Sequence, residues 1–492
     1  MTSQVAIQPI RARLLTGFKW NVIAQIARQA SRTVVAIALA RLLTPQEFGL
    51  AGMALAFTGL AVVFSDVGLG VALVQKKEIS EDDRCTAFWT SVGAGLLLAA
   101  AGILSAPLLA RFYGNSQVAP LFAVTSLSFF FVALQSTQSS LLQREMNFKA
   151  LEMRLIGATV AGGAAGLVAA VMGAGAWALV VQQLAMSVVS TALLWRSSSW
   201  RPKLRFSRQS LRSLRGVGGT VWGSRLLGFV GSNADNIIVG RVLGEVALGL
   251  YAVGFNLVTL PLVRLVAPIQ DTLFPAFSQF QDDRKRLADL WLRSNRVVIA
   301  IVAPVIVGLG VTAPDAVHVV LGARWEGVAI ILQVLCPYAL MVCAGTLGQS
   351  VLIALGKTRP VFWLWIVMTF ANIAAFIVGT AWGVVGVAVA ATLAMVPFQL
   401  VLLALVVRSL GVRVRDVLGS LKGVIEALLV MGLSVLALQA ELTNSVSSPA
   451  LRLVLCIAAG VAVYVPLCIW RAPEIKRDLR RGNRGVADPA LV

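Results

Sequence analysis

The sequence predicts an all-α membrane protein with fourteen transmembrane helices. Of its 492 residues, 58% are hydrophobic and only 13% are charged, whereas a soluble domain carries roughly 25% charged residues. Apolar runs long enough to cross about 30 Å of hydrocarbon recur along the whole length. The sequence does not show the short alternating segments of a transmembrane β-barrel.

The order of these apolar runs gives the individual helices. The tight turns GAG at 173–175 and WG at 382–383 each divide a run that is too long for one crossing. Arg11 and Arg13 lead directly into the first run without a small-residue cleavage site, so no cleavable signal peptide is expected. The predicted spans are 14–42, 47–75, 86–110, 117–143, 150–172, 175–195, 215–242, 247–275, 293–313, 327–354, 361–382, 383–407, 420–438 and 452–470.

Lysine and arginine residues concentrate in every second loop. If the N-terminus lies inside, the cytoplasmic segments hold 31 of these residues and the outer loops hold five. Because positive charges accumulate on the cytoplasmic side, both termini are expected in the cytoplasm. The net charge of +20 therefore follows from topology and does not indicate nucleic-acid binding.

An internal repeat divides the first twelve spans into two halves. RLLTPQEFGL at 41–50 aligns with RVLGEVALGL at 241–250, and DDR at 82–84 aligns with DDR at 282–284. An even number of spans in each repeat makes the halves parallel, related by an axis along the membrane normal. The predicted parts are an N-lobe at 1–195, a basic cytoplasmic linker at 196–215, a C-lobe at 216–408, and two further spans with a basic tail at 409–492.

The first span carries a polar stripe. Asn21, Gln25, Arg28 and Arg32 fall within about 60° of one another on a helix, and Gln29 lies beside them. Placing an arginine in the middle of a bilayer costs roughly 3 kcal/mol or more. The stripe is therefore expected to face protein or a water-filled cavity.

The seventh span repeats this arrangement. Trp222, Arg225, Asn233 and Asn236 share a face of about 80°, with Asp235 at its margin. The position of Arg225 corresponds to that of Gln25 in the repeat. The two helices are expected to present their polar stripes to a common central space.

The remaining embedded charges leave an excess of cations. Span eight adds Arg264 and Asp271, and span two adds Asp66, so that four arginines face three carboxylates on these stripes. Two interpretations stay open: the charges pair inside the bundle and only fix helix packing, or the excess positive charge attracts an anion such as phosphate or carboxylate.

Other chemistry is weakly represented in the sequence. No Walker A motif is present, so energy from bound ATP is not expected. His318 is the single histidine and the five cysteines form no CxxC pair, which argues against a metal site of these residues. No cofactor is expected.

Several stretches resemble one transporter family, the polysaccharide transporters or oligosaccharide flippases. This family belongs to a superfamily that also contains the multidrug and toxin extrusion transporters and the lipid II flippases. The resemblance covers about residues 15–400 and is closest to exporters of colanic-acid-type, capsular or lipopolysaccharide units. The stretches are ARLLTPQEFGL at 40–50, DVGLGVALVQKKEIS at 66–80, LARFYG at 109–114, WGSRLLGFVGSNADNIIVGRVLG at 222–244, GLYAVGFNLVTLPL at 249–262, LFPAFSQFQDD at 273–283 and LGARWEG at 321–327.

The resemblance implies a V-shaped bundle of two six-helix lobes plus two C-terminal helices. It implies a substrate carried on undecaprenyl pyrophosphate and moved to the periplasmic leaflet by alternating access, and it is compatible with a polysaccharide polymerase or assembly protein as a partner. On this basis the pyrophosphate contacts are Arg28, Arg32, Arg225 and Arg264. The expected sugar contacts are Asn21, Gln25, Gln29, Trp222, Asn233 and Asn236. The candidates for ion coupling are Asp66, Asp235 and Asp271.

Two other functions compete with this interpretation. An ion-coupled antiporter for drugs or organic cations calls for an acidic, aromatic cavity, whereas the embedded cations here outnumber the carboxylates. A membrane enzyme that uses lipid-linked sugars needs a sizeable outer loop with acids or histidines. The longest outer loops, about 313–327 and 439–451, are short, so the chain is not expected to be an enzyme.

Overall fold

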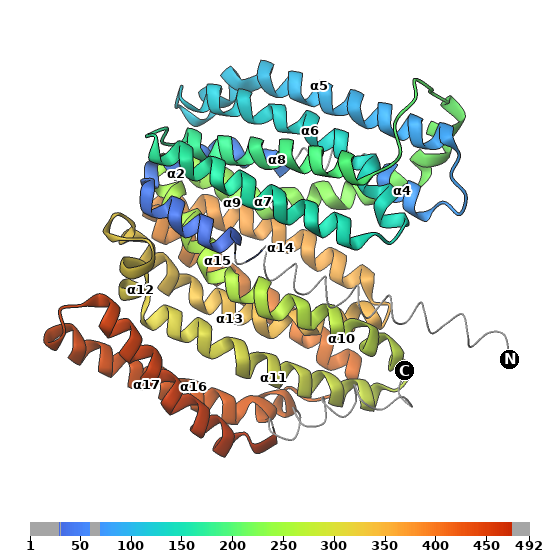
Figure 1. Ribbon diagram of the computed structural model, residues 1–492. Helices are drawn as coiled ribbons and strands as arrows, with labels where there is room; N and C mark the ends of the chain where they lie inside the picture. The colour runs from blue at the N-terminus through green and yellow to red at the C-terminus, as the bar shows by residue number, and fades with distance from the viewer. Residues whose placement is uncertain (1–28, 30, 60–68, 475–492) are drawn as a thin grey trace. The chain divides into compact units, whose positions relative to one another are not determined.

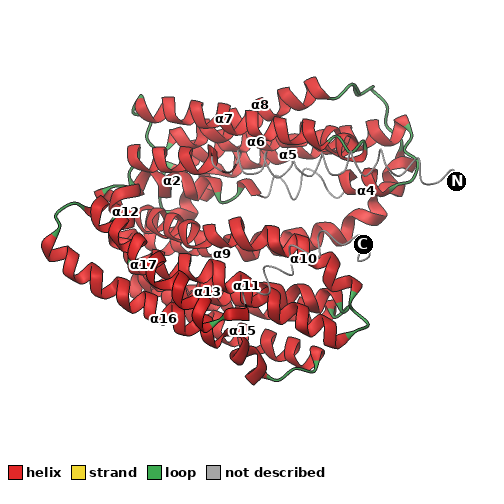
Figure 2. Cartoon of the chain, turned by 60° about the horizontal axis from the view of Figure 1, so that its bottom comes forward, coloured by secondary structure: helices red, strands yellow, loops and turns green. Residues whose placement is uncertain are grey.

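The computed structural model describes residues 29, 31–59 and 69–474, with the side chains of 215–227 excepted. Throughout this part of the chain the regular structure is helical, as Figures 1 and 2 show. Ten of its helical stretches are long and apolar enough to cross a membrane. The predicted all-α, multi-pass membrane class is therefore confirmed.

The chain divides into two compact units, Met1–Gly249 and Leu250–Val492. The described helices of the first unit are residues 31–42, α2 (Pro45–Leu55), α4 (Leu69–Gln75), α5 (Glu81–Tyr113), α6 (Val118–Arg144), α7 (Phe148–Val171), α8 (Trp177–Ser197) and most of α9 (Arg208–Pro261). The second unit continues with the end of α9, η1 (Leu262–Val266), α10 (Ala267–Gln279), α11 (Arg284–Val311), α12 (Ala313–Val320), η2 (Ala323–Trp325), α13 (Gly327–Ala354), α14 (Thr358–Gly379), η3 (Thr380–Trp382), α15 (Gly383–Leu410), α16 (Val414–Ser445) and α17 (Pro449–Arg471).

The helix count of fourteen stays a prediction. Predicted spans 14–42 and 47–75 lie partly outside the described residues. Two of the ten apolar stretches, Gly228–Gln279 and Thr358–Leu410, contain 52 and 53 residues, although about 20 residues suffice for one crossing.

Glycines with positive φ interrupt the long apolar runs. Gly244, with φ 83° and ψ −175°, breaks α9 between the predicted spans 215–242 and 247–275. Gly383, with φ 70°, separates α14 from α15 at the predicted WG turn. A side chain is strained in this region of φ, whereas glycine adopts it without a steric penalty.

Side-chain caps fix where two helices of the first unit begin. Thr44 and Glu47 form a capping box at the start of α2: the Thr44 Oγ1 accepts from the Glu47 N–H, and the Glu47 carboxylate accepts from the Thr44 N–H at 2.7 Å. Ser80 and Asp83 form the same box at the start of α5. Each box satisfies donors that a helix N-terminus otherwise leaves without partners.

The first unit is built around long helices packed side by side. Helix α6 contacts α5 and α8, and α8 also packs against α7. Glycines allow a close approach at the last of these contacts, because a Cβ on Gly162 would lie 2.8 Å from the Gln182 carbonyl oxygen. The absence of a side chain at Gly162 therefore lets α7 and α8 pack closely.

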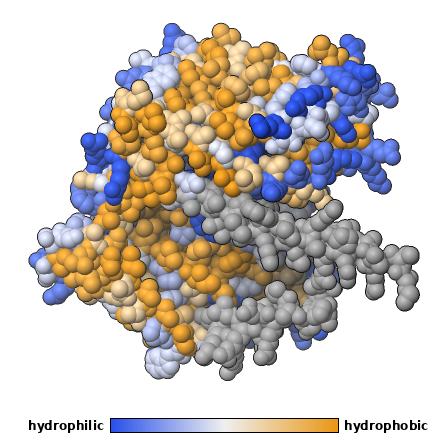
Figure 3. Space-filling view, viewed as in Figure 1, coloured by the Kyte–Doolittle hydropathy of each residue, from blue (hydrophilic) through white to orange (hydrophobic). Residues whose placement is uncertain are grey.

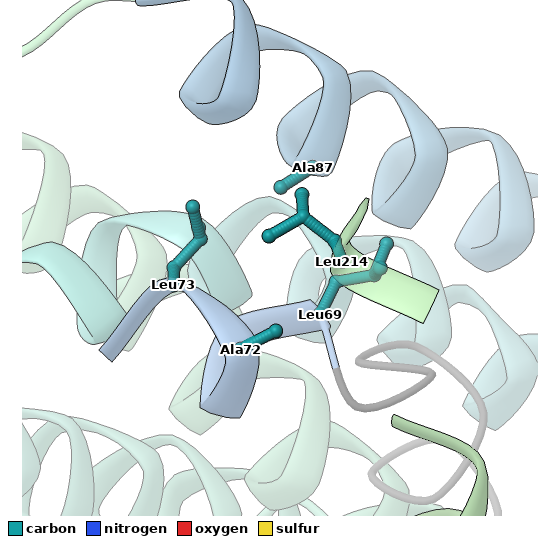
Figure 4. Close-up of a cluster of buried hydrophobic side chains, with 5 residues drawn as sticks. All are labelled: Leu69, Ala72, Leu73, Ala87 and Leu214. Atoms are coloured by element: carbon teal, nitrogen blue, oxygen red, sulfur yellow. The ribbon is translucent and has the colours of Figure 1, made fainter. Parts of the chain in front are cut away.

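A small apolar cluster ties α4 to its neighbours. Leu69, Ala72 and Leu73 of α4 pack with Ala87 of α5 and Leu214 of α9, and all five are almost fully buried (Figure 4). These contacts join the short helix to the first turns of α5 and α9.

The two segments of the predicted repeat contact each other reciprocally. A Cβ on Gly49 would lie 1.7 Å from the Glu245 carbonyl oxygen, and a Cβ on Gly249 would lie 1.9 Å from the Pro45 carbonyl oxygen. These four residues are related by the offset of 200, which pairs position 45 with 245 and position 49 with 249. Contacts exchanged in this way are those expected of segments related by a twofold axis.

The compact units do not follow the predicted lobe boundaries. The first unit extends to Gly249, beyond the predicted linker at 196–215. The contacts of Gly49 with Glu245 and of Gly249 with Pro45 hold the segment that ends at Gly249 against α2. The functional division into an N-lobe, a linker, a C-lobe and two extra helices stays a prediction.

Candidate functional site

The structure describes about half of the predicted site residues. Gln29 comes just before the helix at 31–42, and Arg32 lies in its first turn. Helix α9 carries Asn233, Asp235 and Asn236. Arg264 lies on η1, and Asp271 lies on α10. The predicted residues outside the described positions or side chains are Asn21, Gln25, Arg28, Asp66, Trp222 and Arg225.

Arg32 lies at the beginning of the first described helix, on the same face as Leu39 and Leu43 by the helical period of about 100° per residue. Leu39, Ala40 and Leu43 of this segment are buried, whereas the side chain of Arg32 is exposed. The Gln29 carbonyl oxygen accepts a hydrogen bond from the Thr33 hydroxyl at 3.0 Å. The exposed cationic group of Arg32 thus lies at the end of an apolar helix whose later residues are buried.

Helix α9 combines a buried carboxylate with two amides. Asp235 is 5% exposed, and its Oδ1 accepts from the Asn236 N–H at 2.7 Å. The Asn233 Nδ2 donates to the Phe229 carbonyl oxygen at 2.9 Å, which orients its amide. The buried Oδ1 of Asn236 meets no hydrogen-bond donor among the described residues. This oxygen can therefore accept a hydrogen bond from a hydroxyl group or water.

Arg264 lies in a turn of π-helix. The π-turn η1 follows Pro261, and Pro268 comes directly after its end, at the start of α10. Proline cannot donate a backbone hydrogen bond and disrupts the regular helix, and π-turns occur frequently at functional sites. The half-buried guanidinium of Arg264 is thus placed on irregular backbone within an apolar helix.

The described acidic candidates differ in burial. Asp271 is exposed, whereas Asp235 is buried. Burial disfavours a charged carboxylate, so a buried acid is the better candidate for ion coupling by a proton. Among the described acids of the site, this condition is met by Asp235.

Other arginines of the chain have clear structural roles. Arg296 of α11 forms an ion pair with Glu474. Arg452 pairs with Asp315 at 2.6 Å, where both side chains are largely buried. Arg144 donates to the carbonyl oxygens of Leu73 and Val74 at 3.0 and 3.4 Å, and also to those of Lys76 and Lys77 at the end of α4.

Sequence analysis missed a polar network inside the first unit. The Gln135 Nε2 donates to the Thr191 Oγ1 at 2.9 Å, and the Ser190 Oγ donates to the Gln135 Oε1 at 2.7 Å. Arg154 donates to the same oxygen at 3.4 Å from α7, although the sequence counted it in a cytoplasmic segment. The signal for this network in the sequence was Gln135, a polar residue within an apolar run.

Comparison with known proteins identifies the family. Residues 38–330, more than half of the chain, match the family model described as "Polysaccharide biosynthesis protein". The chain belongs to this family. The polysaccharide transporter resemblance is thereby confirmed.

Curated relatives of this family member cover most of its length. The "Lipopolysaccharide biosynthesis protein WzxC" of Escherichia coli (strain K12) is 29% identical over 84% of this chain and 83% of its own. The "Teichuronic acid biosynthesis protein TuaB" of Bacillus subtilis (strain 168) is 24% identical over 96% of this chain and 99% of its own.

Solved structures show the fold. "Lipid II flippase MurJ, inward closed conformation" aligns with a TM-score of 0.74 over 92% of this family member and 99% of its own chain, at 16% identity. A "multidrug resistance MATE family transporter of the MOP superfamily" aligns with a TM-score of 0.64 over 78% of this chain and 98% of its own, at 15% identity. The family member therefore has the fold that these transporters share.

Proposed function

We propose that the chain is a flippase that moves an oligosaccharide linked to undecaprenyl pyrophosphate from the cytoplasmic to the periplasmic leaflet. Membership of the polysaccharide biosynthesis family supports the saccharide part of this substrate. The fold shared with a solved lipid II flippase supports transport of a lipid-linked form.

The observation that carries the proposal is the placement of cationic side chains on apolar helices. Arg32 is exposed on the first described helix, and Arg264 lies in a π-turn within a 52-residue apolar stretch. A planar guanidinium binds phosphate through two parallel hydrogen bonds. A pyrophosphate crossing hydrocarbon needs such partners, while a polyprenyl tail remains soluble in the lipid.

We assign contacts on the basis of chemical type. The pyrophosphate contacts are Arg28, Arg32, Arg225 and Arg264. The sugar contacts are Asn21, Gln25, Gln29, Trp222, Asn233 and Asn236, because amides and an indole hydrogen-bond or stack on sugar rings. The acceptor oxygen of Asn236 supports its assignment to sugar hydroxyls.

The driving ion is proposed to be a proton, with Asp66, Asp235 or Asp271 as its carrier. The burial of Asp235 favours this residue. Transport that continues undiminished after the pH gradient is dissipated would contradict proton coupling.

The proposed topology places both termini in the cytoplasm of a bacterial inner membrane. The excess of lysine and arginine in alternate loops supports this orientation. Transport by alternating access then requires the outer ends of the two repeats to separate in one state and to meet in the other.

Cells that lack the protein provide the decisive test. They are expected to accumulate lipid-linked repeat units on the cytoplasmic side, and the wild-type gene should reverse this accumulation. Arg28→Ala and Arg225→Ala should fail to reverse it while reaching normal abundance in the membrane. Arg324→Ala removes an exposed arginine without an assigned role and serves as the matched control. Normal export by both site variants would contradict the proposal.

A further inference from the structure

The loop between α8 and α9, residues 198–207, has a defined conformation. The Trp89 Nε1 of α5 donates to the carbonyl oxygen of Lys203 at 2.8 Å. The Ser207 N–H donates to the Thr86 Oγ1, also on α5, at 2.9 Å. These two bonds fix the loop on either side of residues 204–206.

Aromatic side chains hold the base of the same loop. Phe88 lies edge-on to Trp89, Trp195 and Trp200, with ring centroids 5.3 to 6.0 Å apart. The guanidinium of Arg201 lies 5.8 Å from the Trp195 ring centroid. Indole rings collect where a membrane meets water, so this cluster marks the membrane boundary at the end of α8 and the beginning of α5.

The tip of the loop exposes two large apolar side chains. Leu204 is 90% exposed and Phe206 is 57% exposed. Cationic residues flank these two side chains: Lys203 precedes Leu204, Arg205 lies between Leu204 and Phe206, and Arg208 follows. All three cationic side chains are exposed. Because the loop is fixed at both sides of the tip, this display of apolar and cationic groups is part of the fold.

The charge around the tip is strongly positive. The segment 196–215 contains seven lysine or arginine residues and no aspartate or glutamate. Arg205 approaches Asp82 at 3.9 Å, but both side chains are more than half exposed, so this pair is weak. Among the described residues no carboxylate lies within 4 Å of the cationic groups of Lys203 or Arg208. Figure 3 shows hydrophilic side chains gathered at the end of the unit where α8 ends and α5 begins in Figure 1.

We propose that residues 198–208, the interfacial loop, bind anionic phospholipid in the leaflet beside them. Leu204 and Phe206 enter the boundary between headgroups and acyl chains, and Lys203, Arg205 and Arg208 bind the lipid phosphates. Apolar insertion and attraction to anionic lipid act together in segments of this composition. An acidic protein is a poorer match, because the tip adjoins membrane-spanning helices and their indole cluster. The assignment to the cytoplasmic leaflet rests on the topology proposed above.

The environment of the tip can be measured in the full-length protein. A Leu204→Cys variant is labelled with an environment-sensitive fluorophore, since the five native cysteines are all buried, and is placed in lipid nanodiscs. In nanodiscs that contain phosphatidylglycerol, the emission should shift to shorter wavelength. Quenching by an uncharged aqueous quencher should fall by about twofold or more relative to phosphatidylcholine nanodiscs. High salt should reduce this difference, because it screens exposed charges.

Matched variants separate local from general charge effects. Lys203→Gln/Arg205→Gln should abolish the difference between the two lipids. Lys285→Gln/Arg286→Gln removes the same amount of charge from exposed positions of the second unit. This control variant should keep the difference in quenching between the two lipids. Equal quenching in both lipids would overturn the proposal, as would protection that appears only when an acidic cytosolic protein is added. Transport is not measured, so the result does not depend on whether the flippase assignment holds.

Discussion

The chemical role of each arginine in this protein follows from what surrounds it. Arg296 and Arg452 have carboxylate partners in Glu474 and Asp315. Arg144 binds the carbonyl oxygens at the end of α4. Arg264 lies in a π-turn between two prolines. The first three arginines explain how the helices are held, and for Arg264 we propose a contact with the substrate phosphate.

Substitution of Arg264 tests this distinction. Arg264→Ala should reduce export by about tenfold or more, because hydrogen bonds to charged groups contribute about 1.5–3 kcal/mol. Arg264→Lys should restore only part of the activity, since an ammonium keeps the charge but lacks the planar fork. Export of lipid-linked repeat units, normalised to protein in the membrane, measures both. Full activity of Arg264→Ala would exclude a substrate contact at this residue.

The ion pair between Arg452 and Asp315 should affect stability instead. Its side chains are 17% and 6% exposed, and removing one partner of a buried pair costs about 3–5 kcal/mol. Arg452→Met is therefore expected to lower the melting temperature of the purified protein in detergent. Arg452→Met/Asp315→Leu should recover much of the loss, because no charge then stays buried without a partner. If Arg452→Met and the wild type had the same melting temperature, the ion pair would contribute little to stability.

At the scale of single helices, the extent of each apolar run predicted well where a helix lies in the sequence. The predicted span 327–354 coincides with α13, and the GAG and WG turns fall between helices. Helix α16 extends over Val414–Ser445 although 420–438 was predicted. Hydropathy detects only the part of a helix that crosses hydrocarbon, and the polar ends continue beyond it.

Local backbone changes and multi-helix networks were harder to predict. Proline disrupts a regular helix, so Pro261 and Pro268 favour a kink, but the π-turn between them depends on how the helix packs on both sides. The network of Gln135, Ser190 and Arg154 joins three helices. A helical wheel shows which residues of one helix share a face, and it cannot show which helices bring their faces together.

The crossing of α2 and α9 makes a prediction at this scale. Gly49→Ala and Gly249→Ala each place a methyl group against a backbone oxygen, and overpacking of this kind costs about 1–3 kcal/mol. Each variant should lower the melting temperature, as followed by loss of monodisperse protein on heating. Gly93→Ala is the matched control, since a Cβ there meets nothing within 4 Å. Unchanged melting of both crossing variants would contradict a rigid contact.

At the scale of the whole molecule, the sequence repeat has a structural counterpart. The pairs Gly49–Glu245 and Gly249–Pro45 are equivalent under the offset of 200. The repeated DDR motifs both lie at helix N-termini but at different positions, because Asp83 is in the first turn of α5 and Asp283 is the N-cap of α11. The reciprocal contact was not predicted from the repeat, but it joins positions that the offset of 200 makes equivalent. The lengths of the compact units could not be inferred from the repeat either.

A thiol cross-link across this contact tests alternating access. The Gln46 Nε2 donates to the Glu245 Oε1 at 3.2 Å on these segments. The proposed topology places the segments at the outer face, where they must part to release substrate. In the Gln46→Cys/Glu245→Cys variant, a cross-link formed by a short bifunctional thiol reagent should abolish export. When the reagent contains a bond that can be reduced, reduction should break the cross-link and restore export.

Two comparisons make the cross-linking result specific. Each single cysteine variant treated with the same reagent should export normally, since one thiol cannot bridge the segments. A cross-link between Gln135→Cys and Ser190→Cys joins residues that already interact within the predicted N-lobe at 1–195, and it should leave export intact if that lobe moves as a body. Normal export by the joined Gln46→Cys/Glu245→Cys protein would mean that these segments stay together throughout transport, and release would then have to occur without their separation.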